Sequence, residues 1–376
     1  MAKKHNFAAL GFSLFFLSLG GPLQADYVTL PFLKQPEKNI SSTPSAVQIQ
    51  EEFVAKSQEE VSKHKGKVQP VKPKCLNDSG GYFVASFLYW KTDENLNLVY
   101  KISPLEGGTD KLTAKRVDFD YEPGFKIGMG YRINEQAWDL FVNWTWLRSY
   151  PHLSEHSTAS TAIISGLQSP LGGLDFTNAS SAKANGKFAF DSVDIELGKD
   201  FFIGKRVSLR PFAGIKTAWV NQNVHTKYIN PVSPNVALSP IFKEKLHSNS
   251  WGIGPRVGMN SRWMLGKSQF AFLANASGSL LWEEYEFLAA SFFSDQSGMP
   301  RGGATQSEGN SIKPVAEVFL GFDWGMCLPK KTRLRIAAGY EMQYFWDQLE
   351  FAFGQVVDQK QSLDLHGLTA SVRFDF

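Results

Sequence analysis

The sequence has few of the residues on which most catalytic and metal sites depend. Its 376 residues include only two cysteines and seven histidines, and none of these stand at the spacing of a zinc site. The segment GIGPRVG at residues 252–258 is similar to part of a nucleotide-binding loop, but it lies inside an alternating apolar and polar stretch and no helix follows it. We therefore expect no metal, no cofactor and no enzymatic activity.

The sequence also lacks an excess of either charge and, beyond its N-terminus, a long apolar run. Lys and Arg total 39, and Asp and Glu total 36, so the chain has no basic surface for a nucleic acid partner. No window beyond the N-terminus approaches the roughly 18 uninterrupted apolar residues of a transmembrane helix. A helical membrane protein is excluded.

The N-terminal part of the chain has the layout of an export signal followed by a tail. Two lysines precede an apolar run at residues 7–19, and the small residue Ala25 ends the segment, which predicts a signal peptide over residues 1–25. The alternative, an anchor helix, needs a longer apolar run. Residues 26–79 are rich in Lys, Glu, Gln, Ser and Pro, and we expect a polar, flexible periplasmic tail there.

From residue 80 onward, large apolar side chains recur at every second position. In GFKIGMGYRI, residues 124–133, Phe125 and Ile127 fall on one face, and Lys126 and Gly128 on the other. This period predicts β-strands. We find ten such segments, at residues 81–91, 115–132, 137–148, 186–200, 206–220, 246–263, 268–286, 311–325, 332–346 and 362–376.

The connections between these segments indicate a barrel in residues 80–376. Short turns alternate with long loops, the longest being 149–185, 221–245 and 287–310. This alternation and an even strand number are typical of outer-membrane barrels, whose termini lie in the periplasm. We therefore predict an all-β fold, a closed antiparallel transmembrane β-barrel of about ten strands, with twelve as the alternative. Pro211, Pro255 and Pro314 fall inside predicted strands and are expected to need bulges.

The polar face of each strand is expected to face the lumen, and the apolar face the outer-membrane lipid. Barrels of about eight strands are filled by their own side chains, so a ten-strand lumen is narrow. Inward glycines such as Gly128 and Gly258 are expected to leave open space in the lumen, whereas the side chains of Phe141, Phe212 and Phe345 are expected to fill part of the lumen. The predicted pore-lining residues are Lys126, Arg132, Asp194, Glu196, Arg210, Lys216, Arg256, Glu317, Asp323, Arg333, Arg335 and Glu341.

Several separate motifs resemble one known family. They are GGYFVASFLYWKTDENLNLVY, DIELGKDFFI, VSLRPFAGIKTAWV, SWGIGPRVGMNSRWML, RIAAGYEMQYFW and the C-terminal LDLHGLTASVRFDF. Together they are similar to the Legionella-type major outer-membrane protein family, which is also found in chlamydia-like bacteria. The resemblance implies a pore-forming barrel of the Gram-negative outer membrane. The terminal Phe376 resembles the C-terminal signature of such barrels, which implies the barrel assembly machinery as a partner.

Two functions fit these observations. The first is a porin that lets small hydrophilic solutes diffuse across the outer membrane; the mixed charges of its lining predict weak ion selectivity. The alternative is a structural or adhesive surface barrel that displays its loops and has little or no pore activity. Asp364 and His366 share a face of the last strand and could form a catalytic pair. We favour the alternative, in which they are simply the polar end of that strand. A homo-oligomer stays open.

The two cysteines, Cys75 and Cys327, are both placed on the periplasmic side by this topology. Exported thiols can oxidise, and barrel closure brings the first strand close to the turn that holds Cys327. An intramolecular disulfide is the first expectation. Intermolecular cross-linking and two unpaired thiols remain the alternatives.

Overall fold

The computed structural model describes residues 80–376, apart from short gaps within that range. The gaps are at residues 95, 105–108, 134–137, 167–176, 204–205, 234–237, 239, 267, 295–297, 330–331 and 353–357. The predicted signal peptide and the predicted tail lie outside the described residues.

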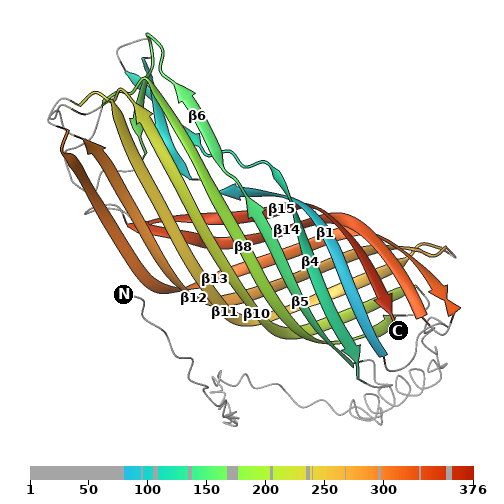
Figure 1. The fold of residues 1–376 in the computed structure, drawn as a ribbon. Helices are drawn as coiled ribbons and strands as arrows, with labels where there is room; N and C mark the ends of the chain where they lie inside the picture. Colours follow the sequence, from blue (N-terminus) through green and yellow to red (C-terminus); the bar gives the residue numbers. More distant parts are fainter. Residues whose placement is uncertain are drawn as a thin grey trace, which may run out of the picture. The chain divides into compact units, whose positions relative to one another are not determined.

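Ten long antiparallel strands form a closed barrel (Figure 1), which confirms the predicted fold class. Along the sheet, β1 pairs with both β4 and β15, and β8 pairs with both β5 and β10, so each barrel strand has two neighbours. The barrel strands are β1 (Gly80–Glu94), β4 (Tyr121–Arg132), β5 (Trp138–Ser149), β8 (Ser181–Lys199), β10 (Val207–Ile229), β11 (Ile241–Met264), β12 (Phe270–Ser294), β13 (Pro300–Leu328), β14 (Thr332–Ala352) and β15 (Asp358–Asp375).

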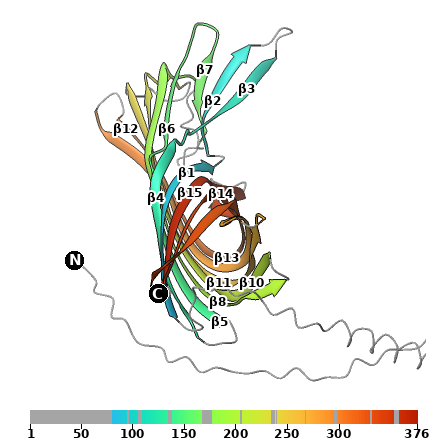
Figure 2. The same cartoon turned by 90° about the vertical axis from the view of Figure 1, so that its right-hand side faces the viewer.

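The barrel has two different ends. The C-terminus and the connections after β4, β8, β11 and β13 lie at one end, which we call the turn end. The connections after β1, β5, β10, β12 and β14 lie at the other, the loop end. Five short strands are additional to the ten barrel strands. Two of them extend the wall: β6 (His152–His156) pairs with β8, and β9 (Phe201–Ile203) pairs with β10. The other three, β2 (Asn97–Pro104), β3 (Asp110–Arg116) and β7 (Ala162–Ser165), form a separate small sheet (Figure 2).

Strand boundaries differ from the sequence prediction mainly at the loop end. The segments 221–245 and 287–310 were expected to be loops, but β10 and β12 continue far into them, and β11 and β13 begin within them. The inward side chains there, including Val224, Phe242 and Phe287, are buried. Burial of these apolar side chains stabilises the parts of the strands that extend beyond the membrane. The predicted segment 115–132 also begins later, at Tyr121, because its first residues belong to β3.

The prolines within strands do not require bulges, contrary to expectation. Pro211 pairs with Met259 and Pro314 with Leu280 in unbroken register. Around Pro255 the β11–β12 pairing resumes in the same register, with Ile253 opposite Trp282 before the proline and Arg256 opposite Ser279 after it. The ladder therefore loses a local bond at Pro255 without gaining a residue. The irregularity that does occur lies in β14, between Phe345 and Leu349, where Asp347 has a φ of 52°.

The outward face carries a band of exposed apolar side chains between two rows of aromatic residues. On β11 the rows are marked by Trp251 and Trp263; at about 3.3 Å per residue and a tilt of about 45° they are roughly 28 Å apart, close to the ~25 Å apolar band of such barrels. The row toward the loop end holds Tyr89, Tyr121, Trp219, Trp251, Trp282, Tyr340 and Trp346, and the row toward the turn end holds Trp138, Phe201, Trp263, Phe270, Phe374 and Phe376. The barrel therefore has the surface of a bilayer-spanning wall. Within the described part of the chain, no helix has the length and hydrophobicity needed to cross a membrane.

Candidate functional site

The twelve polar residues predicted to line the lumen all lie on the inward face of their strands. They share this face with the buried residues of the wall, while their neighbours in sequence, such as Ile127, Ile195 and Ile215, are exposed on the outer face. Inward placement follows from the alternation of side chains along a strand. That these twelve residues line a conducting pore stays a prediction.

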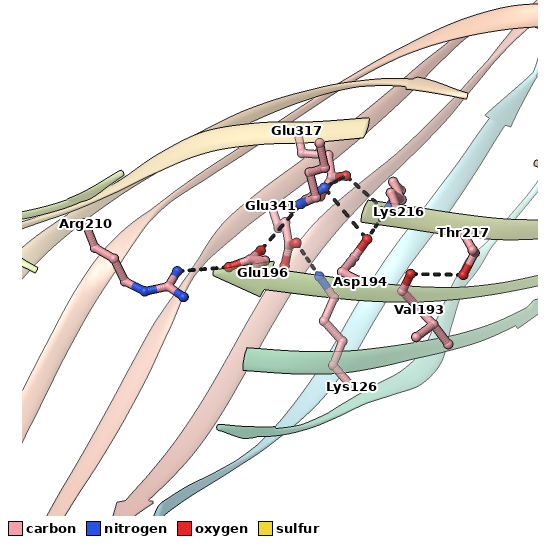
Figure 3. A network of polar contacts seen from close by, with 10 residues as sticks. Lys126, Val193, Asp194, Glu196, Arg210, Lys216, Thr217, Glu317 and Glu341 are labelled. Atoms are coloured by element: carbon pink, nitrogen blue, oxygen red, sulfur yellow. Dashed lines mark hydrogen bonds and ion pairs between the residues drawn. The ribbon is translucent and has the colours of Figure 1, made fainter. Parts of the chain in front are cut away.

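A compact network of ion pairs crosses the middle of the barrel (Figure 3). The Nζ of Lys216 lies 3.1 Å from Asp194 Oδ1 and 3.0 Å from Glu317 Oε1. Arg256 donates to both carboxylate oxygens of Glu317, and its Nε lies 3.4 Å from Glu196 Oε1. These five residues are buried, so each charge is compensated by partners on other strands rather than by water.

A second group of contacts joins non-adjacent strands beside this network. The Nζ of Lys126, on β4, contacts Glu341 on β14, and Thr369 on β15 donates to Glu341 Oε2 at 2.9 Å. The Nε1 of Trp90 donates to the hydroxyl of Thr369 at 3.0 Å. Because two strands, β1 and β15, lie between β4 and β14 in the sheet, the Lys126–Glu341 pair crosses part of the lumen.

The turn end of the lumen is rich in arginine. Arg210 donates to Asp139 Oδ1 at 2.8 Å and to Glu196 Oε2 at 2.9 Å. Arg262 binds both oxygens of Asp323 through Nε, at 2.9 and 3.1 Å. Further contacts join Arg132 and Arg373 to Asp375, and the guanidinium of Arg373 lies 3.6 Å from the centroid of the Tyr82 ring.

Two cavities lie beside these groups. The first, of about 280 Å³, is at the turn end and is lined by six arginines, namely Arg132, Arg210, Arg262, Arg333, Arg335 and Arg373, and by Asp139, Asp200 and Asp323 among others. We call it the turn-end cavity. The second, of about 240 Å³, is lined by Lys126, Glu196, Arg256, Glu317 and Glu341 among others. Asn260 and Asn275 contribute to the lining of both.

Asp200 stands at the edge of the turn-end cavity, in the connection after β8. Its burial raises the pKa of the carboxyl above the ordinary value, and the nearby carboxylate of Asp139 acts in the same direction. Arg373, Arg210 and Arg335 act in the opposite direction. Asp200 is therefore the acidic group of this cavity that gains a proton more readily than an exposed aspartate.

Toward the loop end the lumen is filled by apolar side chains, which we call the apolar plug. The rings of Phe190 on β8 and Phe345 on β14 meet across the barrel with centroids 5.6 Å apart. Each plug residue is at most 4% exposed, and all belong to one contiguous buried cluster: Leu88, Trp90, Leu147, Phe190, Ala218, Leu281, Val315, Phe345 and Leu365. A cluster of this kind is packed like a protein interior.

The inward glycines do not leave the room that was expected of them. A Cβ on Gly128 would lie 2.6 Å from Cζ of Phe141, and a Cβ on Gly258 would lie 2.5 Å from Cζ of Phe212. The space above these glycines is therefore already occupied by phenylalanine rings. Filling by Phe212 and Phe345, both buried, agrees with the sequence analysis.

Above the plug, the irregularity in β14 turns a polar side chain into the lumen. Gln348 is buried, and its Nε2 donates to Ser250 Oγ at 3.0 Å and to Glu283 Oε1 at 2.9 Å. On the opposite wall, Gln222 donates to Glu94 Oε2 at 2.8 Å. These hydrogen bonds join strands that are not neighbours, so polar side chains also reach across the upper lumen.

Sequence reasoning missed part of the turn-end cluster and most of the plug. Arg262, Arg373 and Asp375 follow the same alternation as the predicted residues, and applying it over each full strand identifies them. The plug has a weaker signal. On several strands the inward face itself becomes apolar toward the loop end, as at Leu88 and Trp90, which indicates a filled interior.

The Asp364 and His366 pair is formed, but on the outward face. His366 Nδ1 lies 3.3 Å from Asp364 Oδ2, and the imidazole stacks on Tyr340 with centroids 6.1 Å apart. Tyr340 and Tyr121 belong to the aromatic row toward the loop end. The pair therefore lies at the membrane boundary and outside the lumen.

Of the two cysteines, Cys327 lies near the end of β13 and is disulfide-bonded. Cys75 lies outside the described residues. The Cys75–Cys327 pairing stays a prediction.

Comparison with solved structures finds outer-membrane proteins at low similarity. The outer-membrane protease OmpT of Escherichia coli is 10% identical, with a TM-score of 0.42, and the match covers 82% of this chain and 100% of that one. OprG of Pseudomonas aeruginosa is 10% identical, with a TM-score of 0.23, covering 80% and 98%. Ail, the attachment invasion locus protein of Yersinia pestis, is 11% identical, with a TM-score of 0.21, covering 79% and 99%. Similarity at this level carries no argument about function.

The family comparison is more specific. No curated protein matches the chain. A family model, however, matches residues 77–376, which include all ten barrel strands, the two aromatic rows and the filled lumen. The chain belongs to the family described as Legionella pneumophila major outer membrane protein precursor, and it is an outer-membrane β-barrel.

Proposed function

We propose that this protein is a structural surface barrel of the outer membrane with little or no passive pore activity in the described conformation. The observation that carries the proposal is the contact between Phe190 and Phe345 across the lumen, within a plug of buried apolar side chains. Ions and hydrophilic solutes must shed their hydration to pass such a plug, which costs several kcal/mol or more. The geometry thus favours the second of the two functions considered from the sequence.

The loop end provides the surface that such a barrel would display. Strands β10, β11, β12 and β13 have 23, 24, 25 and 29 residues, whereas about 9–11 suffice to cross a bilayer. The small sheet is fixed to these extensions: Tyr228 donates to the carbonyl of Leu98 at 2.9 Å, and Ser165 donates to Glu244 Oε1 at 2.6 Å. We place this end outside the cell and the turn end in the periplasm, as is usual for barrels with short periplasmic turns.

A porin remains the second candidate because of the turn-end half of the lumen. Two cavities of about 280 and 240 Å³ lie there, and their linings carry both signs of charge, as expected of a weakly selective channel. In this reading small hydrophilic solutes enter from the turn end and cross only when the plug opens. The two functions therefore differ in whether the plug moves.

Single-channel recording in a planar bilayer separates the two candidates. The folded wild-type protein is expected to give no conductance steps. The double variant Phe190→Ala, Phe345→Ala is the positive control, because it removes the two rings that meet across the lumen and is expected to create steps. Frequent steps from the wild-type protein, with a conductance unchanged in the double variant, would show that ions take another path and would favour the porin.

A further inference from the structure

The turn-end cavity has a charge that its own residues do not balance. Six arginines line it against three aspartates, Asp139, Asp200 and Asp323. Asp375 contacts Arg132 and Arg373, and Glu196 contacts Arg210; including both carboxylates still leaves an excess of one positive charge. A cavity of this kind attracts anions and repels cations.

Several guanidinium groups in the cavity also keep unused hydrogen-bond donors. Arg210 Nη2, Arg262 Nη2 and Arg335 Nε are buried and have no hydrogen-bond partner. Arg210 and Arg262 already bind carboxylates through their Nε atoms, whereas Arg335 Nε lies 3.8 Å from Asp375 Oδ2, beyond hydrogen-bond distance. A buried donor without an acceptor is costly, so an oxygen-rich ligand would relieve several such costs at once.

Arg333 is the clearest indication of a ligand. Its side chain lines the cavity and the residue is 9% exposed. Within the described part of the chain it makes no hydrogen bond and no ion pair, whereas the other five arginines of the lining all contact a carboxylate. Gly325 lies directly beneath its guanidinium: a Cβ there would be 3.2 Å from Arg333 Nη2. The guanidinium is thus held in the cavity without a direct ion pair to a described residue, although the carboxylates of Asp375 and Asp323 lie close enough to act on it electrostatically.

We infer that the turn-end cavity binds a small oxyanion, the phosphate or sulfate group of a soluble solute, with Arg333 as its principal ligand and Arg335 and Arg262 beside it. Guanidinium groups bind tetrahedral oxyanions through paired N–H donors, and these charge-assisted hydrogen bonds are among the strongest in proteins. A cavity of about 280 Å³ is far larger than one water requires. The site is enclosed by the barrel wall, so we assign it a soluble anion rather than a lipid headgroup.

This inference does not depend on the state of the plug. The lining includes Asp200 from the connection after β8, Phe202 of β9 and Ser208 at the start of β10, which places the cavity at the turn end. An anion bound there would be held in a sealed surface barrel and in a porin alike. The experiment below therefore tests the anion site separately from the proposed function.

Isothermal titration of the folded full-length protein in detergent with sodium sulfate, and then sodium phosphate, tests the site. Ionic strength is held constant with chloride, so that general screening is matched. The wild-type protein is expected to bind one anion in a saturable manner, and Arg333→Gln should bind at least tenfold more weakly. Arg148→Gln is the matched control, because Arg148 pairs with Asp191 on the outer face of the wall and does not line the cavity; its affinity should equal that of the wild type.

A second variant covers the case in which Arg333→Gln does not fold. Asn275→Asp preserves side-chain size and adds a negative charge to the cavity lining, so it should also weaken sulfate binding severalfold. Absence of saturable heat from the wild type, or wild-type affinity in both variants, would overturn the inference. Competition of sulfate with phosphatidylglycerol in nanodiscs, absent with phosphatidylcholine, would show a lipid headgroup as the ligand and contradict the assignment to a soluble anion.

Discussion

The ammonium of Lys216 lies 6.0 Å from the centroid of the Phe345 ring, and this contact marks the border between the two halves of the lumen. On the turn-end side of the border, Lys216 pairs with Asp194 and Glu317. On the loop-end side, Phe345 packs against Phe190. Polar and apolar interiors thus meet where β10 and β14 face each other across the lumen.

Neutralising Lys216 should destabilise the barrel. Lys216→Met keeps most of the side-chain volume, but among the described residues it leaves Asp194 with only Arg256 Nη1, 3.9 Å away, as a counter-charge, and leaves Glu317 with Arg256 alone. Breaking a buried ion pair from one side costs about 3–5 kcal/mol. The free energy of unfolding from lipid vesicles, measured by urea titration, gives the value. Lys227→Met is the matched control, because Lys227 is exposed on the same strand; equal effects of both substitutions would argue against the network.

The assignment of inward and outward faces makes a second prediction. Val257 lies on the outer face of β11, between the rows marked by Trp251 and Trp263, and is 61% exposed. Val257→Arg should therefore lower the free energy of unfolding by about 2–4 kcal/mol, as expected for arginine near the bilayer midplane. The inward control is Ser277→Arg, since Ser277 lines the second cavity and is paired with Glu317. A larger loss for Ser277→Arg would reverse the assigned faces.

Much of the barrel follows from the sequence because a strand in a membrane wall must present one face to lipid. The alternation in residues 124–133 and in the C-terminal strand fixes which side chains point inward, and all twelve predicted lumen residues do so. Strand number follows from the same pattern. The prolines were misjudged, because loss of one ladder bond at Pro255 is tolerated without a change of register.

The filled lumen could not be read from the alternation in the same way. Which inward side chains meet across the barrel depends on strand tilt and stagger, which place β8 opposite β14. Alternation alone also cannot show that Phe141 covers Gly128. Alternation identified Arg333 as an inward charge. That Arg333 makes no hydrogen bond or ion pair within the described residues could not be predicted in this way, because it depends on the positions of all its neighbours.

The turn-end cavity predicts a pH dependence of anion binding. Burial holds the pKa of Asp200 above its ordinary value, and the charged groups facing it are Asp139, Arg373, Arg210 and Arg335. Protonation of Asp200 removes one negative charge, so sulfate affinity should rise as the pH falls through the pKa of Asp200. Asp200→Asn should bind sulfate at the low-pH affinity at every pH. A wild-type affinity that does not change with pH, or that falls as the pH falls, would contradict this role.

The disulfide of Cys327 gives a prediction about chain association. Since the sequence contains one other cysteine, Cys75, an intramolecular bond should leave the protein monomeric in non-reducing electrophoresis of alkylated envelopes. Cys75→Ser should then expose a thiol at Cys327 that reacts with maleimide. Oligomer ladders that collapse on reduction would instead show that Cys327 links two copies.

If the lumen is wet toward the turn end and sealed by the plug, cysteine labelling at two positions of one strand shows both properties most directly. Ser208 lines the turn-end cavity, whereas Ala218 lies in the plug, and both are small inward residues of β10. In the folded protein, a water-soluble methanethiosulfonate should modify Ser208→Cys at least about tenfold faster than Ala218→Cys, a difference of about 1.4 kcal/mol. Equal rates, with both variants shown to be folded, would mean that water reaches the plug and that the lumen is open.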